Sequence, residues 1–262
     1  MSNSTAPSEA NHDESEVPPA VSCVVCGRAD CSGCEAQPAP TGPGIAWEGR
    51  GASMAQRLWS TALSSSLEPA RTFGALPDGA VAPALGFALL AELIAIGSFA
   101  VLVVLLGLAV APRLSLNVLT RPLGVGYVLA AVVAASVTMV ALHALWGACL
   151  EWGARAKEPH GLRQSVRFAL YACGWDLLTS PAGLLQGLTQ RGFPAGFAAL
   201  VGAVRAPRPA LRAYQDERRR FEREAQRRAM QLSLAVLTAT LLALLPIMGW
   251  ALIAFAEWAF AL

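Results

Sequence analysis

The chain has 262 residues, of which 55% are hydrophobic and only 15% charged, and its formal net charge is +2. This composition lies outside the range of soluble globular domains, and so small a charge without a base-reading motif argues against nucleic-acid binding. We therefore expect a membrane protein with the lipid bilayer as its main partner and no nucleic acid. Lys157 is the only lysine, an arginine bias that associates the chain with a GC-rich bacterial genome.

The N-terminal residues 1–22 are polar and acidic, with Glu9, Asp13, Glu14 and Glu16 and no lysine or arginine. Such a segment has too few apolar residues for a core, so we predict a disordered tail. It also lacks the apolar run of a signal peptide. Residues 35–50 are rich in proline and glycine and predict a linker. The stretch between them, 23–34, is expected to be a tethered module.

Four cysteines, Cys23, Cys26, Cys31 and Cys34, form the pattern CxxC-x4-CxxC within that module. In a cytosolic setting such a cluster favours metal over disulfides. Each CxxC can supply two thiolates to a tetrahedral zinc ion, so the pattern predicts a structural Zn knuckle. With all four positions filled, such a zinc supports no hydrolysis. An iron–sulfur centre is the alternative, because the last three cysteines match the C-x4-C-x2-C spacing of plant-type ferredoxins.

Residues 51–78 contain MAQRLWSTALSSSL, whose apolar positions recur at helical spacing. The pattern predicts an amphipathic helix lying in the membrane interface. A short helix packed on the protein's own membrane domain is an equally good interpretation.

Residues 79–262 predict an all-α, polytopic helical membrane domain. Segments near 83–110, 123–150 and 232–262 each exceed the roughly 20 residues that a bilayer core requires. The first has sixteen Leu, Ile, Val or Phe residues, which outweigh the cost of about 3 kcal/mol for inserting Glu92. The last is too long for one upright span, and Pro246 with Gly249 predicts a kink or a tight hairpin there.

The segment 164–205 is a weak membrane segment, because Asp176 and Pro181 interrupt a moderately apolar stretch. An Arg-rich helix is expected at 209–229. Fourteen basic residues lie between Arg155 and Arg228, and basic residues accumulate on the cytoplasmic side. We therefore expect a cytosolic N-terminus and an inward-facing middle region, with 164–205 forming a re-entrant or interfacial pair or two tilted spans.

Ionisable side chains in apolar segments are the next candidates for function, since they are costly in lipid and usually face the bundle interior or water. They are Glu92, His143, Glu151, Asp176 and Glu257. A proton or cation path is one interpretation, with His143 pairing with Glu92 or Asp176. The other is that the glutamates reach the interface while His143 and Asp176 hydrogen-bond neighbouring helices. His143, Gly147 and Glu151 share one helical face. Cys149 and Cys173 are expected to be small core residues.

Two stretches resemble the Yip-type family of membrane proteins. LEPARTFGALPDGAVAPALGFALLAEL is similar to the family's entry into its first span, and VALHALWGACLEWGARAKEPHGLRQSVRFALYACGWDLLTSP to its central signature. The positions concerned are His143, Gly147, Arg167, Ala169 and Tyr171, and the similarity covers about residues 67–190. The Arg-rich insertion 192–228 and the Trp175–Asp176 pair depart from the family.

The resemblance implies an α-helical membrane domain without established enzymatic activity, whose eukaryotic relatives bind small GTPases. No residue here marks a GTPase site. The chain also contains no GxSxG, HExxH or Walker motif in a suitable setting, so we do not expect an enzyme. Two functions remain: a membrane scaffold or adaptor that offers its zinc module to a cytosolic protein, or a small transporter or channel using Glu92, His143 and Asp176.

Overall fold

The structure is a computed structural model that describes residues 45–49, 51–74, 76, 79–121, 124–154, 161–218 and 223–260. All of them belong to one compact unit, Pro43–Leu262. The predicted all-α fold is confirmed, because the described residues form helices and no strand. The acidic tail 1–22, the cysteine module 23–34 and most of the linker 35–50 lie outside the described residues.

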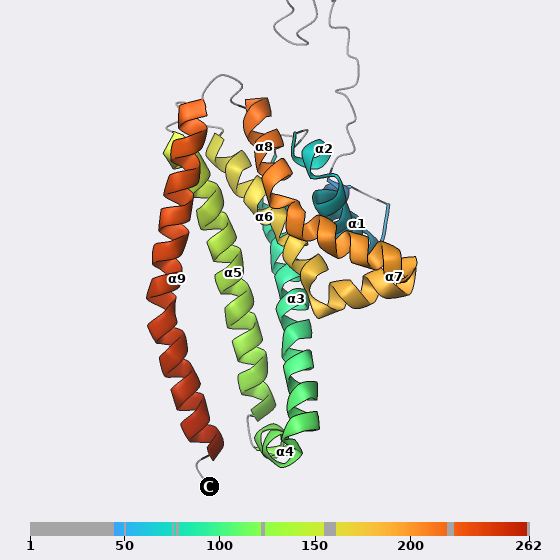
Figure 1. Cartoon of the computed structure of the whole chain (residues 1–262), viewed down its shortest axis with the longest axis vertical. Helices are drawn as coiled ribbons and strands as arrows, with labels where there is room; N and C mark the ends of the chain where they lie inside the picture. The colour runs from blue at the N-terminus through green and yellow to red at the C-terminus, as the bar shows by residue number, and fades with distance from the viewer. Residues whose placement is uncertain are drawn as a thin grey trace, which may run out of the picture. The chain divides into compact units, whose positions relative to one another are not determined.

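Three long apolar helices run side by side: α3 (Val81–Val110), α5 (Gly124–Ala154) and α9 (Arg223–Phe260) (Figure 1). Each contains a stretch long and apolar enough to cross a membrane. Outward-facing residues such as Val103, Leu129 and Leu242 are more than half exposed, as lipid-facing side chains are when no lipid surrounds them. The chain therefore has the architecture of a helical membrane protein.

The predicted spans near 83–110, 123–150 and 232–262 fall on these three helices. The short helix α4 (Pro112–Thr120) connects α3 to α5 at one end of the bundle. Helix α9 continues through Pro246 without a break, so the alternative of a hairpin there is wrong. Proline is tolerated in membrane helices because neighbouring groups can satisfy the backbone positions that it frees.

Helix α6 (Gly161–Thr179) lies against α3, α5 and α1 and is mostly buried. Ser180 then caps α7 (Pro181–Arg205) by accepting a hydrogen bond from the Gly183 amide. In Figure 1 the chain from α6 to α8 (Pro207–Arg218) leaves and returns at the bundle end where α5 finishes and α9 starts. Neither α6 nor α7 is among the three helices of the described residues that are long and apolar enough to cross a membrane, and the prediction of a re-entrant or interfacial pair or two tilted spans stays a prediction. The range of the predicted Arg-rich helix 209–229 is divided between α8 and the first turns of α9, and residues 219–222 lie outside the described residues.

Helix α7 folds back on itself at Gly192. This residue has a φ of 72°, a left-handed conformation that suits glycine, and the helix divides there into two segments. The two segments then pass so closely that a Cβ at Gly187 would lie 3.1 Å from the Gly196 Cα. Glycine at both positions therefore permits the crossing.

The segment before the first span forms the 3₁₀ helix η1 (Ala46–Glu48), α1 (Met54–Leu67) and α2 (Pro69–Gly74). Helix α1 packs on α6: a Cβ at Gly174 would lie 2.9 Å from the Ala62 Cα, and the Trp175 indole donates to the Ser65 carbonyl at 2.9 Å. This packing agrees with the interpretation of 51–78 as a helix packed on the protein's own bundle, and the prediction that it lies in the membrane interface stays a prediction.

Candidate functional site: a polar cluster between three helices

Three of the predicted site residues come from three different helices: Glu92 from α3, His143 from α5 and Asp176 from α6. Glu92 lies about 16 Å along α3 from Val81, and His143 about 16 Å before the end of α5 at Ala154. Since α3 and α5 run antiparallel (Figure 1), the two side chains are at the same height in the bundle.

His143 stands between the two carboxylates. Its Nε2 lies 2.9 Å from Asp176 Oδ2 and 3.8 Å from Glu92 Oε1. The exposed fractions of the side chains are 1% for Glu92, 15% for His143 and 39% for Asp176. The cluster therefore runs from a fully buried carboxylate to one that reaches the surface, and the structure brings the predicted pairs together.

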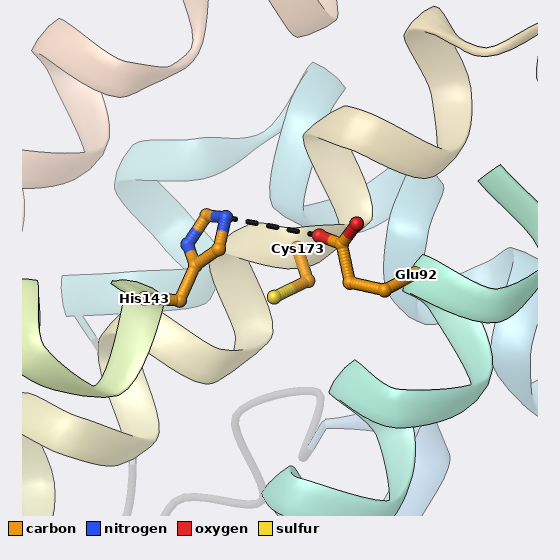
Figure 2. Close-up of side chains that lie close together, drawn as sticks. All are labelled: Glu92, His143 and Cys173. Carbon is orange, nitrogen blue, oxygen red and sulfur yellow. Dashed lines mark ion pairs between the residues drawn. The ribbon is translucent and has the colours of Figure 1, made fainter. Parts of the chain in front are cut away.

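Cys173 completes the cluster and was not predicted to belong to it. It lies one helical turn before Asp176 on α6 and is completely buried. The potential ligand atoms of Glu92, His143 and Cys173 all lie within 4.8 Å of one another, and Figure 2 shows the three side chains converging. The signal in the sequence was the spacing of Cys173 and Asp176, which places them on the same face of α6.

Two polar atoms of this cluster lack a hydrogen bond. Among the described residues, neither Glu92 Oε1 nor His143 Nδ1 has a hydrogen-bond partner. Glu92 sits among Ala88, Ala91 and Ala95, which are all buried. A buried carboxylate oxygen in apolar surroundings is costly unless a partner or a cation compensates for its lost hydration.

The face shared by His143, Gly147 and Glu151 is turned toward α6. A Cβ at Gly147 would lie 2.5 Å from the Ser165 carbonyl oxygen, so the two helices cross closely at this glycine. On one side of the crossing His143 meets Asp176, and on the other Glu151 accepts a hydrogen bond from Ser165 at 2.9 Å. Glu151 is 7% exposed. Glu257, on α9, is exposed.

A second polar group joins the N-terminal segment to α6. The Arg167 side chain is fully buried, and its Nη2 lies 2.5 Å from Glu48 Oε1. The Tyr171 hydroxyl donates to the same oxygen at 2.5 Å. Burial, and then the neighbouring Glu48 carboxylate, raise the pKa of Tyr171 well above its usual range. Arg167 and Tyr171 are two of the positions in the Yip-type signature, whereas Glu48 was not singled out in the sequence.

The predicted zinc ligands Cys23, Cys26, Cys31 and Cys34 lie outside the described residues, so the zinc and iron–sulfur alternatives stay predictions. No family model, no curated protein and no solved structure matches this chain. The resemblance to the Yip-type family also stays a prediction.

Proposed function

We propose that this chain is a small membrane transporter or channel that passes a cation through its helical bundle at Glu92, His143 and Asp176. One observation carries the proposal: ionisable side chains from three helices converge at one height in a membrane-type bundle, and the deepest carboxylate has an oxygen without a hydrogen bond. Intramembrane ionisable residues are costly and usually mark an ion pathway. Asp176, the most exposed member, provides the entrance.

A purely structural cluster would be expected to satisfy its own hydrogen bonds, because each buried unsatisfied group reduces stability. The Glu151–Ser165–Tyr214 group is held together by hydrogen bonds: Ser165 contacts Glu151 Oε2 at 2.9 Å and the Tyr214 hydroxyl at 2.8 Å. Glu92 Oε1, which faces an imidazole and a thiol, has no hydrogen bond among the described residues, and this supports a cation as its partner.

The test is a flux assay with the purified chain in proteoliposomes, using trapped dyes for protons and for divalent cations and tracer uptake for K⁺. We expect flux above that of protein-free vesicles, and its loss in His143→Ala and Asp176→Asn. Glu257→Gln is the matched control, since it removes an exposed carboxylate outside the cluster. Flux that persists in both cluster variants, or no flux of any cation, would overturn the proposal.

The second candidate is a non-enzymatic scaffold or adaptor in a bacterial cytoplasmic membrane, with the N-terminus in the cytosol. Its support is the CxxC-x4-CxxC module, which precedes a Pro/Gly linker and is suited to a tethered contact with a cytosolic protein. If the chain is such a scaffold, deleting residues 1–44 is expected to abolish capture of the cytosolic protein partner, while His143→Ala and Asp176→Asn leave that capture intact. Elemental analysis is expected to find about one zinc per chain fewer in a Cys23→Ser/Cys26→Ser variant than in the parent.

A further inference from the structure

We infer that Glu92, His143 and Cys173 form a binding site for a divalent transition-metal ion of the zinc class inside the bundle, with Asp176 as the fourth ligand. This inference rests on the proposed function, because it assigns the chemical class of the cation at the same cluster. It concerns a site separate from the N-terminal cysteines, since none of its residues belongs to the CxxC module.

The donor atoms identify the class of metal. An imidazole nitrogen, a thiol sulfur and carboxylate oxygens form a mixed set, and thiolate with imidazole favours Zn²⁺ and its chemical relatives over Mg²⁺ or Ca²⁺, which take oxygen ligands. An alkali cation would also find too few oxygens here. The combination of cysteine, histidine and glutamate therefore favours a divalent ion of intermediate softness, such as Zn²⁺.

The distances require only small movements. Tetrahedral zinc with bonds of about 2.0–2.3 Å places its ligand atoms about 3.3–3.8 Å apart. His143 Nε2 and Glu92 Oε1 are already 3.8 Å apart, and Cys173 completes a set whose ligand atoms lie within 4.8 Å of one another. A contraction of this set by about 1 Å is within reach of side-chain rotations.

The charges of the buried ligands balance those of the ion. Glu92 and Cys173 are 1% and 0% exposed, and as carboxylate and thiolate they carry two negative charges against the two positive charges of the metal. Binding releases to solvent the protons that the thiol and the buried carboxyl group carry. The buried part of the complex is then neutral, which a low-dielectric interior favours. Asp176 adds its negative charge at the exposed edge, where water can solvate it.

An independent observation points to a ligand at this place. Glu92 Oε1 is buried, has no hydrogen-bond partner among the described residues and is directed toward His143 and Cys173 in Figure 2. The nearest cationic candidate is His143, whose Nε2 is engaged with Asp176 at 2.9 Å. A metal ion between the three side chains would supply Glu92 Oε1 with the partner that it lacks.

The test uses the full-length protein with Cys23, Cys26, Cys31 and Cys34 all replaced by serine, so that the N-terminal module no longer binds metal. Co²⁺ is the probe, because tetrahedral Co²⁺ with a thiolate ligand has a diagnostic visible and near-ultraviolet absorption. We expect about one Co²⁺ per chain, displaced by Zn²⁺. Cys173→Ser is expected to remove the thiolate band, and Glu92→Gln and His143→Ala to weaken binding at least about tenfold.

Cys149→Ser is the matched control, since Cys149 is the other cysteine among the described residues and is equally buried, at 1% exposed, but stands outside the cluster. It is expected to bind Co²⁺ like the parent. X-ray absorption of the Zn²⁺-loaded parent needs no cluster variant and is expected to detect one sulfur at about 2.3 Å.

No Co²⁺ in the serine-substituted parent, no sulfur around zinc, or equal losses in Cys149→Ser and Cys173→Ser would overturn the inference. Flux of protons or K⁺ that depends on His143 and Asp176, without Co²⁺ binding, would overturn the metal site and leave the proposed function standing. Absence of all flux together with a Co²⁺ site that depends on Cys173 would overturn the proposed function and leave the metal site standing.

Discussion

Replacing Glu48 with glutamine removes a charged partner of Arg167, whose side chain is fully buried. Losing one member of a buried ion pair costs about 3–5 kcal/mol, because the buried charge that remains loses an interaction that offset its lost hydration. Glu48 keeps 28% of its side chain exposed, so water can partly replace it and the lower end, about 3 kcal/mol, is expected. That is a change of roughly 150-fold in the folding equilibrium. Glutamine still offers an oxygen to the Tyr171 hydroxyl, so the substitution isolates the charge.

The matched control is Glu68→Gln, which removes the partner of Arg71 in a pair 3.2 Å apart. Those side chains are 58% and 65% exposed, so the cost is expected to stay below about 1 kcal/mol. Both variants are unfolded reversibly in mixed detergent micelles, and tryptophan fluorescence is followed, with Trp47 next to the substituted residue. Equal losses of stability in the two variants would refute the assignment of a stabilising role to the buried pair.

Three further predictions concern helix contacts. Tyr171→Phe is expected to reduce the fall in the free energy of unfolding at alkaline pH. The raised pKa of folded Tyr171 gives stability that is present below the unfolded pKa of about 10 and lost as pH rises from there. A parent and a variant whose stabilities depend identically on pH would contradict this. Gly147→Val is expected to lower the free energy of unfolding by more than about 2 kcal/mol in the same assay, because its Cβ would lie 2.5 Å from the Ser165 carbonyl oxygen. Gly126→Val is the control, since a Cβ at Gly126 would meet no neighbouring helix within 4 Å. Gly192→Ala is expected to cost about 1–2 kcal/mol through its positive φ, while Gly249→Ala, also with open space around it, is neutral or stabilising in thermal unfolding.

The three long helices were predictable because insertion into lipid depends on local composition. A stretch such as 83–110 is apolar enough to cross whatever its neighbours are, and α3 covers it. The same reasoning left 164–205 undecided, since Asp176 and Pro181 interrupt its moderately apolar stretch. Asp176 and the buried Arg167 of α6 are compatible with the bundle because His143 and Glu48, distant in sequence, meet them.

The candidate site was predictable in part for a related reason. Helical spacing places His143 on one face with Gly147 and Glu151, and the glycine forms the close crossing with α6. Which helix would pack there is a tertiary property, so the choice between Glu92 and Asp176 as partners stayed open. Cys173 was assigned to the core by its apolar setting; its membership of the cluster depends on the rotation of α6 relative to α3.

The buried polar groups of the bundle differ in the kinds of atoms that they bring together, and this difference separates structural from functional candidates. Glu48, Arg167 and Tyr171 share contacts of 2.5 Å, and Ser165 bridges Glu151 and Tyr214. Such groups hold helices in register, and removing them is expected to lower the free energy of unfolding. Glu92 has an oxygen without a hydrogen bond that faces an imidazole and a thiol. Imidazole nitrogen, thiolate sulfur and carboxylate oxygen are all metal-ligand atoms, so their convergence at one buried place is the reason for proposing a cation there rather than a purely structural contact.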